Sequence, residues 1–360
     1  MILNIFLFVP LGVGLALARV RPRTALLIAA LVSGLVEVAQ LYVPGRDASI
    51  GDLIWNTVGG GFGFALVTSA RHWTTPPDAQ KSWWSLSASL VATAILVLTG
   101  VMLQPTYTDH PYSGQWTPKL GHLDWYEGEV LHATVGSRTV PSGRLEDSRA
   151  IRDLLRNGSS IRVTAVAGPP TSQLSALFGI ADTRQNIILL IGPRGDHLLY
   201  LPRMRAESFR LDRPVLDVPD VMDLTPGDTI EVRVWRDGAA YCATVNQDQV
   251  CGLGFTVGSG WTLLQYSESF PLWLTRVLNP LWLCLLLVPV GYWSRPNVYS
   301  VLGAVVLVAG LALAPAVTGL LATTSAEWIG AGLGVVIGMF LRFTVTRRLT
   351  TRKPDQIRAA

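Results

Sequence analysis

The chain has 360 residues, of which 49% are hydrophobic and only 15% are charged, and its mean hydropathy is +0.37. These values exclude an intrinsically disordered chain, a collagen-like chain and a small protein held together by disulfides. The mean hydropathy is nevertheless too low for a chain built entirely of membrane helices. We therefore expect apolar spans in some regions and a soluble domain in another.

Seven apolar stretches come close to the length of about 20 residues that a helix needs to cross a bilayer. They are residues 1–18, 25–43, 52–69, 83–103, 277–293, 300–321 and 326–344. The first and the fifth are short and contain proline, so they could instead be core helices of a soluble domain. The intervening region has no such stretch and holds most of the acidic residues. The sequence thus predicts a polytopic α-helical membrane bundle of about seven spans, in regions 1–103 and 277–345, with a soluble insertion at 104–276 and a basic tail at 346–360.

The positions of the basic residues predict the orientation of the chain, because short cytoplasmic loops retain Lys and Arg. With seven spans and the amino terminus outside, the inner segments hold twelve basic residues against two acidic ones, a net charge of +10. The remainder carries −6, so the overall charge of +4 reports membrane orientation. Basic residues that border membrane spans also argue against a nucleic-acid partner. We expect an uncleaved first helix, an extracytoplasmic insertion and a cytoplasmic carboxy terminus.

The cysteines agree with this orientation. Cys242 and Cys251 lie in the segment YCATVNQDQVC, inside the insertion. A two-residue turn at Asn246 and Gln247 would place the two cysteines opposite each other on paired strands, close enough for a disulfide. Disulfides persist outside the cytoplasm, so we predict this bridge, with two buried thiols as the alternative. Cys284 lies in a span and is expected to be a packing residue.

Several polar residues fall inside or beside the predicted spans. Ser33, Glu37 and Gln40 have the spacing of one helix face, and Asp52 and Asn56 have it again in the next span. Asn4 begins the first span, and Arg46 lies in the turn between the second and third. All of these side chains are expected to converge on the outer leaflet.

Ionisable groups in a membrane are costly and are candidates for function. The cluster could be a structural clasp, in which Arg46 neutralises Asp52 or Glu37. It could instead be a pocket for the head group of an amphiphile or envelope precursor, with Arg46 on an anionic group such as phosphate. Acid–base catalysis by Glu37 or Asp52 is a further alternative, but no nucleophile accompanies them and we name no catalytic residue. A transporter would need a polar path to the cytoplasmic side, and the sequence shows none below Ser33.

The same residues carry a resemblance to a known family. The segments NIFLFVPLG and SGLVEVAQLYVPGRDASIGDLIWNTVGGGFGF resemble the VanZ-like membrane family. The matching positions are Asn4, Phe8, Pro10, Leu11, Gly12, Glu37, Gln40, Arg46, Asp52, Asn56, Gly59 and Gly63. The family is named for a protein linked to resistance to the glycopeptide antibiotic teicoplanin. The resemblance implies a role in the bacterial envelope, hence the inner (cytoplasmic) membrane, and leaves any reaction unnamed. Among these residues Pro10, Gly12, Gly59 and Gly63 are expected to serve helix packing.

The carboxy-terminal spans resemble a degenerate copy of this plan. Glu327, Gly334 and Gly338 match Asp52, Gly59 and Gly63 at a constant offset of 275 residues. Asn279 and the segment Pro289-Val290-Gly291 are similar to Asn4 and Pro10-Leu11-Gly12, although the proline motif needs a different offset. The positions aligned with Glu37 and Gln40 hold Ala312 and Pro315. A true repeat would retain the scaffold and lose the polar pocket; chance similarity between glycine-rich helices is the alternative.

Region 104–276 has the pattern of a β domain. Runs such as SIRVTAVAG, NIILLIG, TIEVRVW and AAYCATV are rich in β-branched or aromatic residues and are separated by turn signals. They predict a two-sheet sandwich or jelly roll, preceded by a helix near residues 146–156. The order of the runs resembles concanavalin-like and laminin-G-like sandwiches.

That resemblance implies carbohydrate binding. The candidate glycan contacts are Trp116, Trp125, Tyr126, Tyr200 and Trp235. Calcium is a possible cofactor, with Asp182, Asp196 and Asp237 as candidate ligands; no other metal or cofactor is expected. The leading hypothesis is a non-enzymatic protein that binds an envelope glycan or lipid-linked precursor, the sandwich being held above the outer-leaflet cluster. A membrane enzyme, an assembly protein and a transporter are the alternatives, and the sequence assigns no oligomeric state.

Overall fold

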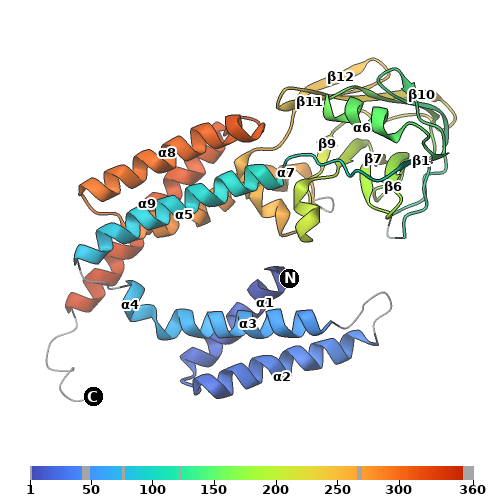
Figure 1. Ribbon diagram of the computed structural model, residues 1–360. Helices are drawn as coiled ribbons and strands as arrows, with labels where there is room; N and C mark the ends of the chain where they lie inside the picture. The colour runs from blue at the N-terminus through green and yellow to red at the C-terminus, as the bar shows by residue number, and fades with distance from the viewer. Residues whose placement is uncertain (1, 43–48, 75–77, 122, 266–269, 352–360) are drawn as a thin grey trace. The chain divides into compact units, whose positions relative to one another are not determined.

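The structure is a computed structural model that describes residues 2–42, 49–74, 78–121, 123–265 and 270–351. The chain divides into two compact units, Met1–Trp83 and Trp84–Ala360. Figure 1 labels the helices and several of the strands.

The first unit is helical. It comprises α1 (Ile2–Leu17), α2 (Pro22–Gln40), α3 (Ile50–Thr68) and the short α4 (Ala70–Thr74). Proline at the first position of α2 suits a helix start, because its missing N–H would have no partner there.

Helices α1 and α3 pack backbone against backbone. A Cβ atom on Gly12 would lie 1.9 Å from the carbonyl oxygen of Gly60. Cβ atoms on Gly59 and Gly63 would lie 2.1 Å from the carbonyl oxygens of Ile5 and Val9. No side chain fits at these distances, so glycine is required for this crossing.

The second unit contains four long helices. They are α5 (Asp78–Met102), α7 (Leu272–Trp293), α8 (Val298–Thr318) and α9 (Ser325–Thr351). Helix α5 packs on α8, where Cβ atoms on Gly303 and Gly310 would meet Ser89 and Thr93. The fourth predicted span therefore belongs with the carboxy-terminal helices, whereas the sequence grouped it with the first three.

Six helices in the described parts of the chain are long and apolar enough to cross a membrane, namely α2, α3, α5, α7, α8 and α9. Helix α1 is apolar but shorter. The prediction of a multi-pass membrane protein is confirmed, whereas the count of seven spans stays a prediction. Helix α7 begins five residues earlier than expected, directly after Pro271.

The region between α5 and α7 folds as two antiparallel sheets of six strands. One sheet has the order β4-β1-β6-β7-β8-β9 and the other has the order β12-β11-β10-β5-β2-β3. The strands of the first sheet are β1 (Tyr112–Trp116), β4 (Gly143–Arg144), β6 (Phe178–Asp182), β7 (Ile187–Arg194), β8 (His197–Pro202) and β9 (Leu216–Val218). Those of the second are β2 (Glu129–Val135), β3 (Arg138–Thr139), β5 (Ile161–Val166), β10 (Thr229–Asp237), β11 (Ala240–Val245) and β12 (Asp248–Leu253).

The two sheets share one hydrophobic core, as in a β-sandwich. Strand β10 alternates between buried Val232 and Val234 and more exposed Glu231 and Arg233, the period of a strand with one face inward. Strand β7 is instead buried on both faces, and its second face packs in a separate small cluster. This explains why NIILLIG reads as a continuous apolar run.

The position of the helix within this domain differs from the expectation. Helix α6 (Ser148–Arg156) lies between β4 and β5, after the first four strands, and not before the sandwich. Three of those four strands carry little sequence signal, because β3 and β4 have only two residues each and β1 is interrupted by Gly114.

The predicted disulfide is confirmed: Cys242 on β11 is bonded to Cys251 on β12. The predicted turn is also present, since Val245 pairs with Asp248 and leaves Asn246 and Gln247 between the strands. Asn246 has a φ of +53°, a conformation that Asn tolerates better than most residues.

The sandwich and the segment that leads into it are hydrogen-bonded to the end of α8. Arg236 of β10 donates to the carbonyl oxygen of Gly319 at 3.1 Å, and Gln104 donates to that of Thr318 at 3.1 Å. Gly319 ends α8 with a φ of +72°, a common conformation for a residue that terminates a helix. Residues 256–263, which we call the strap, follow the last strand and form a buried 3₁₀ turn (Val257–Leu263) before α7.

Candidate functional site

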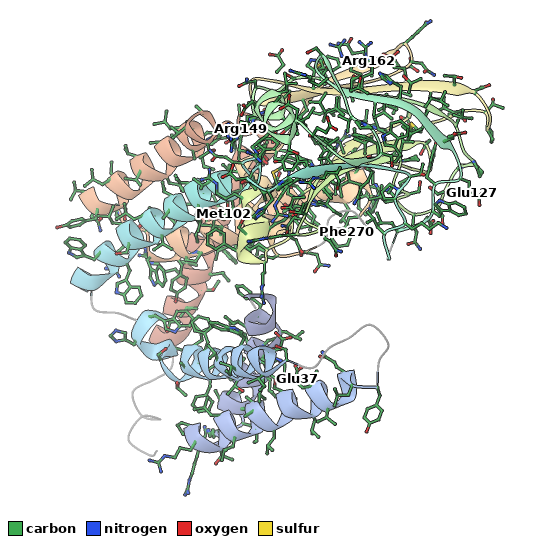
Figure 2. The ribbon with its side chains drawn as sticks, turned by 45° about the vertical axis from the view of Figure 1, so that its right-hand side comes forward. Glu37, Met102, Glu127, Arg149, Arg162 and Phe270 are labelled. Carbon is green, nitrogen blue, oxygen red and sulfur yellow. A yellow bond between two sulfur atoms is a disulfide. The ribbon has the colours of Figure 1, made fainter. Side chains whose placement is uncertain are left out.

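The polar cluster of the first unit is built on the facing sides of α2 and α3. Ser33 and Glu37 are four residues apart on α2, and Asn56 lies on α3; all three are buried. The amide of Asn56 donates to the hydroxyl of Ser33 at 3.0 Å. Figure 2 shows Glu37 on the side of α2 that faces α3. The helical spacing noted in the sequence therefore does bring these three side chains together.

Glu37 also accepts a hydrogen bond from the start of α3. The backbone N–H of Ser49, the residue before this helix, donates to Oε2 of Glu37 at 2.8 Å. The first N–H groups of a helix lack partners within the helix, so Glu37 satisfies one from the neighbouring helix. Sequence reasoning missed the part played by Ser49.

Two acceptors of the cluster are unused. Oε1 of Glu37 and Oδ1 of Asn56 are buried and have no hydrogen-bond partner among the described residues. Glu37 is 8% exposed and Asn56 is 4% exposed, so both atoms are shielded by protein. A buried acceptor without a donor costs about 1–3 kcal/mol. The cluster is therefore incomplete as a hydrogen-bond network.

Asp52 adds a second carboxylate at the first turn of α3. Its side chain is half-buried, and no described residue donates a hydrogen bond to it or pairs with it. Gln40, at the end of α2, is half-buried as well. The side chain of Asn4 and the whole of Arg46 lie outside the described residues. In its described part the cluster thus holds two carboxylates and no cation.

Helices α7 and α9 cross in the same way as α1 and α3. Cβ atoms on Gly291, Gly334 and Gly338 would meet the carbonyl oxygens of Val335, Cys284 and Val288 at 1.9, 2.2 and 2.1 Å. These pairs are the three pairs of the α1–α3 crossing, shifted by 279 residues in the first helix and by 275 in the third. The same shift of 279 matches Pro10 to Pro289, each of which lies inside its helix.

The two crossings therefore give a residue-by-residue correspondence. It matches Asp52 to Glu327 and Asn56 to the buried Ala331. It also corrects one pairing from the sequence: Asn4 corresponds to Leu283, and Asn279 lies one turn nearer the start of α7. The second half keeps the scaffold and lacks the amide of the cluster.

The carboxylate of Glu327 is fully used, in contrast to that of Asp52. Its Oε2 accepts the backbone N–H of Thr324 at 2.8 Å, while the Thr324 hydroxyl accepts the N–H of Glu327 at 3.3 Å. This reciprocal pair is a capping box, and its Thr-x-x-Glu pattern is readable in the sequence. Oε1 of Glu327 accepts the hydroxyl of Thr256 in the strap.

The aromatic residues predicted to contact glycans do not gather at one place. Trp116 and Trp235 lie on different sheets, and Trp125 lies in a loop, 54% exposed, with the Lys119 ammonium 4.0 Å from its ring centre. Tyr126 and Tyr200 are buried in the core, where burial raises the pKa of both hydroxyls. Of the candidates, Trp125 is the one with an exposed ring.

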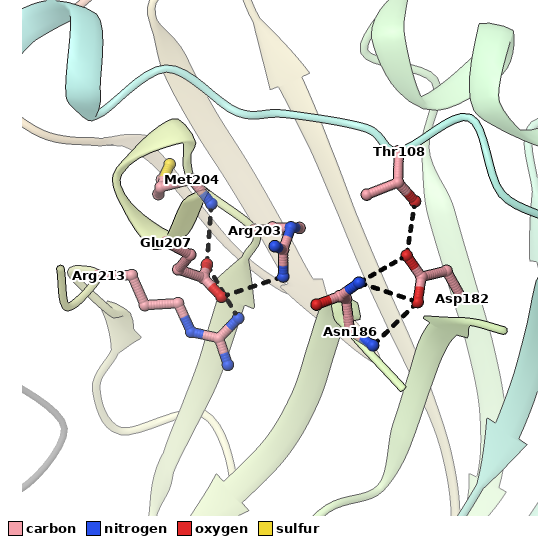
Figure 3. Close-up of polar contacts among 7 residues, drawn as sticks. All are labelled: Thr108, Asp182, Asn186, Arg203, Met204, Glu207 and Arg213. Carbon is pink, nitrogen blue, oxygen red and sulfur yellow. Dashed lines mark hydrogen bonds and ion pairs between the residues drawn. The ribbon is translucent and has the colours of Figure 1, made fainter. Parts of the chain in front are cut away.

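The candidate calcium ligands are also dispersed. Asp182 is buried and its carboxylate accepts hydrogen bonds from Thr108, from the backbone of Arg184, and from the backbone and side chain of Asn186, at 2.9–3.1 Å (Figure 3). Burial acts to raise the pKa of Asp182, but these hydrogen bonds outweigh it and lower the pKa. Within the described residues no three His, Cys, Asp or Glu side chains are close enough to hold a metal ion.

Figure 3 also shows a second polar group in the sandwich. The carboxylate of Glu207 accepts the backbone N–H of Met204 at 3.0 Å and lies near the guanidinium groups of Arg203 and Arg213, at 3.5 and 3.4 Å. These contacts close the 3₁₀ turn Arg205–Phe209, so Glu207 serves the fold.

Comparison with known proteins bears on the first unit. No curated protein and no solved structure matches the chain. The family model of VanZ/LLP1 matches residues 1–71. That segment contains α1, α2, α3 and the whole described polar cluster, so the cluster lies in a VanZ-like membrane region.

Proposed function

We propose that this chain is a bacterial envelope membrane protein that binds the polar head group of an amphiphilic envelope component at the outer leaflet. The binding residues are Glu37, Asp52 and Asn56. The observation that carries the proposal is the pair of buried acceptors on Glu37 and Asn56 that no described residue uses, beside the carboxylate of Asp52, which no described residue contacts through a hydrogen bond or ion pair.

The energetics favour a binding role over a purely structural one. A polar group in a bilayer is costly, and a group that serves only the fold is expected to be fully hydrogen-bonded. Ser33 and the N–H of Ser49 bond to part of the cluster, and the described part of the chain offers no donor to Oε1 of Glu37 or Oδ1 of Asn56. A ligand with hydrogen-bond donors would satisfy them.

The β-sandwich fits the same role as a glycan-recognition domain. Its disulfide supports an extracytoplasmic location, and the exposed ring of Trp125 offers a surface on which a sugar can stack. A link to resistance against teicoplanin follows from the VanZ-like region, since that antibiotic acts on the envelope.

Co-purification tests the proposal. The full chain is extracted with its native lipid by an amphipathic polymer, and the bound amphiphiles are identified by mass spectrometry. We expect one envelope amphiphile to be enriched over the bulk membrane and to be lost in Glu37→Gln and Asp52→Asn. The matched control Glu327→Gln, which preserves the capping box, should retain it.

A structural clasp is the second candidate, and the Asn56–Ser33 hydrogen bond favours it. A clasp predicts that no amphiphile is enriched. It also predicts that Asn56→Leu lowers the amount of folded protein in proportion to any phenotype. Asp52 has no hydrogen-bond or ion-pair partner among the described residues. If enrichment of an amphiphile depends on Asp52, the cluster does more than hold the helices together.

A further inference from the structure

We propose that the head group bound by the first unit is a neutral, hydroxyl-bearing group, a sugar in kind. The head group would lie at the start of α3, in the position that the strap occupies at the start of α9. This inference rests on the proposed function and names the chemistry of its ligand.

The correspondence between the two crossings is its basis. Three glycine-to-carbonyl contacts recur with two constant shifts, so the outer ends of α3 and α9 are equivalent in position. Glu327 lies where Asp52 lies, and Thr324 lies where Ser49 lies, each at a shift of 275 residues. The donors that contact the acceptors of the α7–α9 crossing therefore indicate which donors the α1–α3 crossing can bind.

In the second crossing the strap supplies hydroxyl and N–H donors. The hydroxyl of Thr256 donates to Glu327, and the indole N–H of Trp261 donates to the Asn279 amide oxygen at 2.8 Å. The strap is seated closely, because a Cβ on Gly258 would lie 2.1 Å from Oε1 of Glu327. All seven residues Val257–Leu263 are buried.

In the first crossing the equivalent donors are missing from the described residues. The backbone N–H of Thr324 donates to the carboxylate of Glu327, which lies on the helix that Thr324 precedes. The backbone N–H of Ser49 donates instead to Glu37 on the neighbouring helix α2. Asp is one methylene shorter than Glu and closes capping boxes less often, and here the carboxylate of Asp52 makes no such bond. The carboxylate of Asp52 therefore accepts no hydrogen bond from the described residues. The equivalent carboxylate, that of Glu327, accepts one from the hydroxyl of Thr256.

The described side chains of the cluster favour a head group that brings hydrogen-bond donors. The described cluster has two carboxylates, so an anionic group such as phosphate would be repelled at short range. A hydroxyl donates to a carboxylate and can also accept from an amide. A hydroxyl of a sugar ring would donate to the half-buried carboxylate of Asp52, which a phosphate oxygen that carries no proton cannot do.

Binding of two simple amphiphiles to the full chain in lipid nanodiscs tests this. Dodecyl β-D-glucoside and dodecyl phosphate share a tail and differ in head group, and native mass spectrometry gives the affinity of each. We expect the glucoside to bind more tightly than the phosphate, and Asp52→Asn to weaken the glucoside about tenfold or more. Glu327→Gln should leave its affinity unchanged.

Phosphate binding as tight as glucoside binding would overturn the inference, as would glucoside binding that is unaffected by Asp52→Asn. Thermal unfolding of each variant shows that loss of binding is not loss of fold. If a native amphiphile co-purifies in a Glu37-dependent manner and the glucoside does not bind, the inference alone fails. If neither occurs, the proposed function fails with it.

Discussion

At the scale of single residues, the fate of each carboxylate depends on the donors within reach. Glu327 and Asp52 occupy equivalent places, yet the carboxylate of Glu327 accepts two hydrogen bonds and that of Asp52 accepts none from the described residues. The sequence predicted Glu37, Asp52 and Asn56 from helical spacing. It could not predict their free acceptors, because these depend on which backbone N–H groups the fold brings near.

Asp182 provides a test of the hydrogen bonds in the sandwich. Asp182→Asn exchanges acceptors for an NH₂ group that faces other donors, so we expect the free energy of unfolding to fall by about 1–3 kcal/mol at pH 7. Because the pKa of Asp182 is lowered in the folded state, its stabilisation is present above the unfolded pKa near 3.8 and is lost as pH falls through the folded pKa.

The difference between Asp182→Asn and wild type should therefore shrink below about pH 4. Denaturant unfolding followed by tryptophan fluorescence at pH 7 and at pH 3.5 checks this. Asp237→Asn, at an exposed turn position, is the matched control and should change stability by less than about 0.5 kcal/mol. An equal loss at both pH values would contradict the assignment.

At the scale of helices and strands, the positions of the long helices could be predicted from the sequence, whereas the register of their crossings could not. The helix positions were predicted well, since apolar length alone marks them. The glycines lie at close backbone crossings, but the register of these crossings was not predicted, because Asn279 was paired with Asn4 instead of the residue one turn later. Strands β3 and β4 have two residues each and carry no periodic signal.

Alanine at the α1–α3 crossing measures the importance of this packing. Gly63→Ala places a methyl group 2.1 Å from the carbonyl oxygen of Val9, so the helices must separate, at a cost of about 1–3 kcal/mol. Gly14→Ala, with no atom within 4 Å of its Cβ, should instead be neutral or stabilise α1 by up to about 1 kcal/mol. Thermal unfolding of the full chain in nanodiscs compares them; equal effects would contradict the crossing.

At the scale of the whole molecule, the sequence predicted an inserted β domain between two sets of helices, and the described structure has it. It did not predict that α5 belongs to the second unit, because hydropathy identifies a span without identifying its neighbours. The sandwich could be recognised as β, but the predicted glycan contacts do not define one surface, because the candidate aromatic residues are spread over two sheets and a loop.

The disulfide tests the orientation of the insertion. If the sandwich is extracytoplasmic, protein made in its native membrane should show one reactive thiol after denaturation without reductant, that of Cys284, and three after reduction. Gel shifts with a maleimide-linked polymer count them. Reduction should lower the free energy of unfolding by about 2–3 kcal/mol. Three reactive thiols before reduction would place the domain in the cytoplasm.

We propose that the outer end of the first crossing accepts a donor-bearing head group, whereas the strap fills the outer end of the second. Photo-crosslinking of the full chain in nanodiscs with a diazirine-labelled alkyl glucoside, followed by peptide mapping, tests this most directly. We predict labelling within α2 (Pro22–Gln40) and α3 (Ile50–Thr68) that Asp52→Asn abolishes, and none at the outer ends of α7 and α9. Equal labelling of both crossings, or no labelling of α2 and α3, would contradict it.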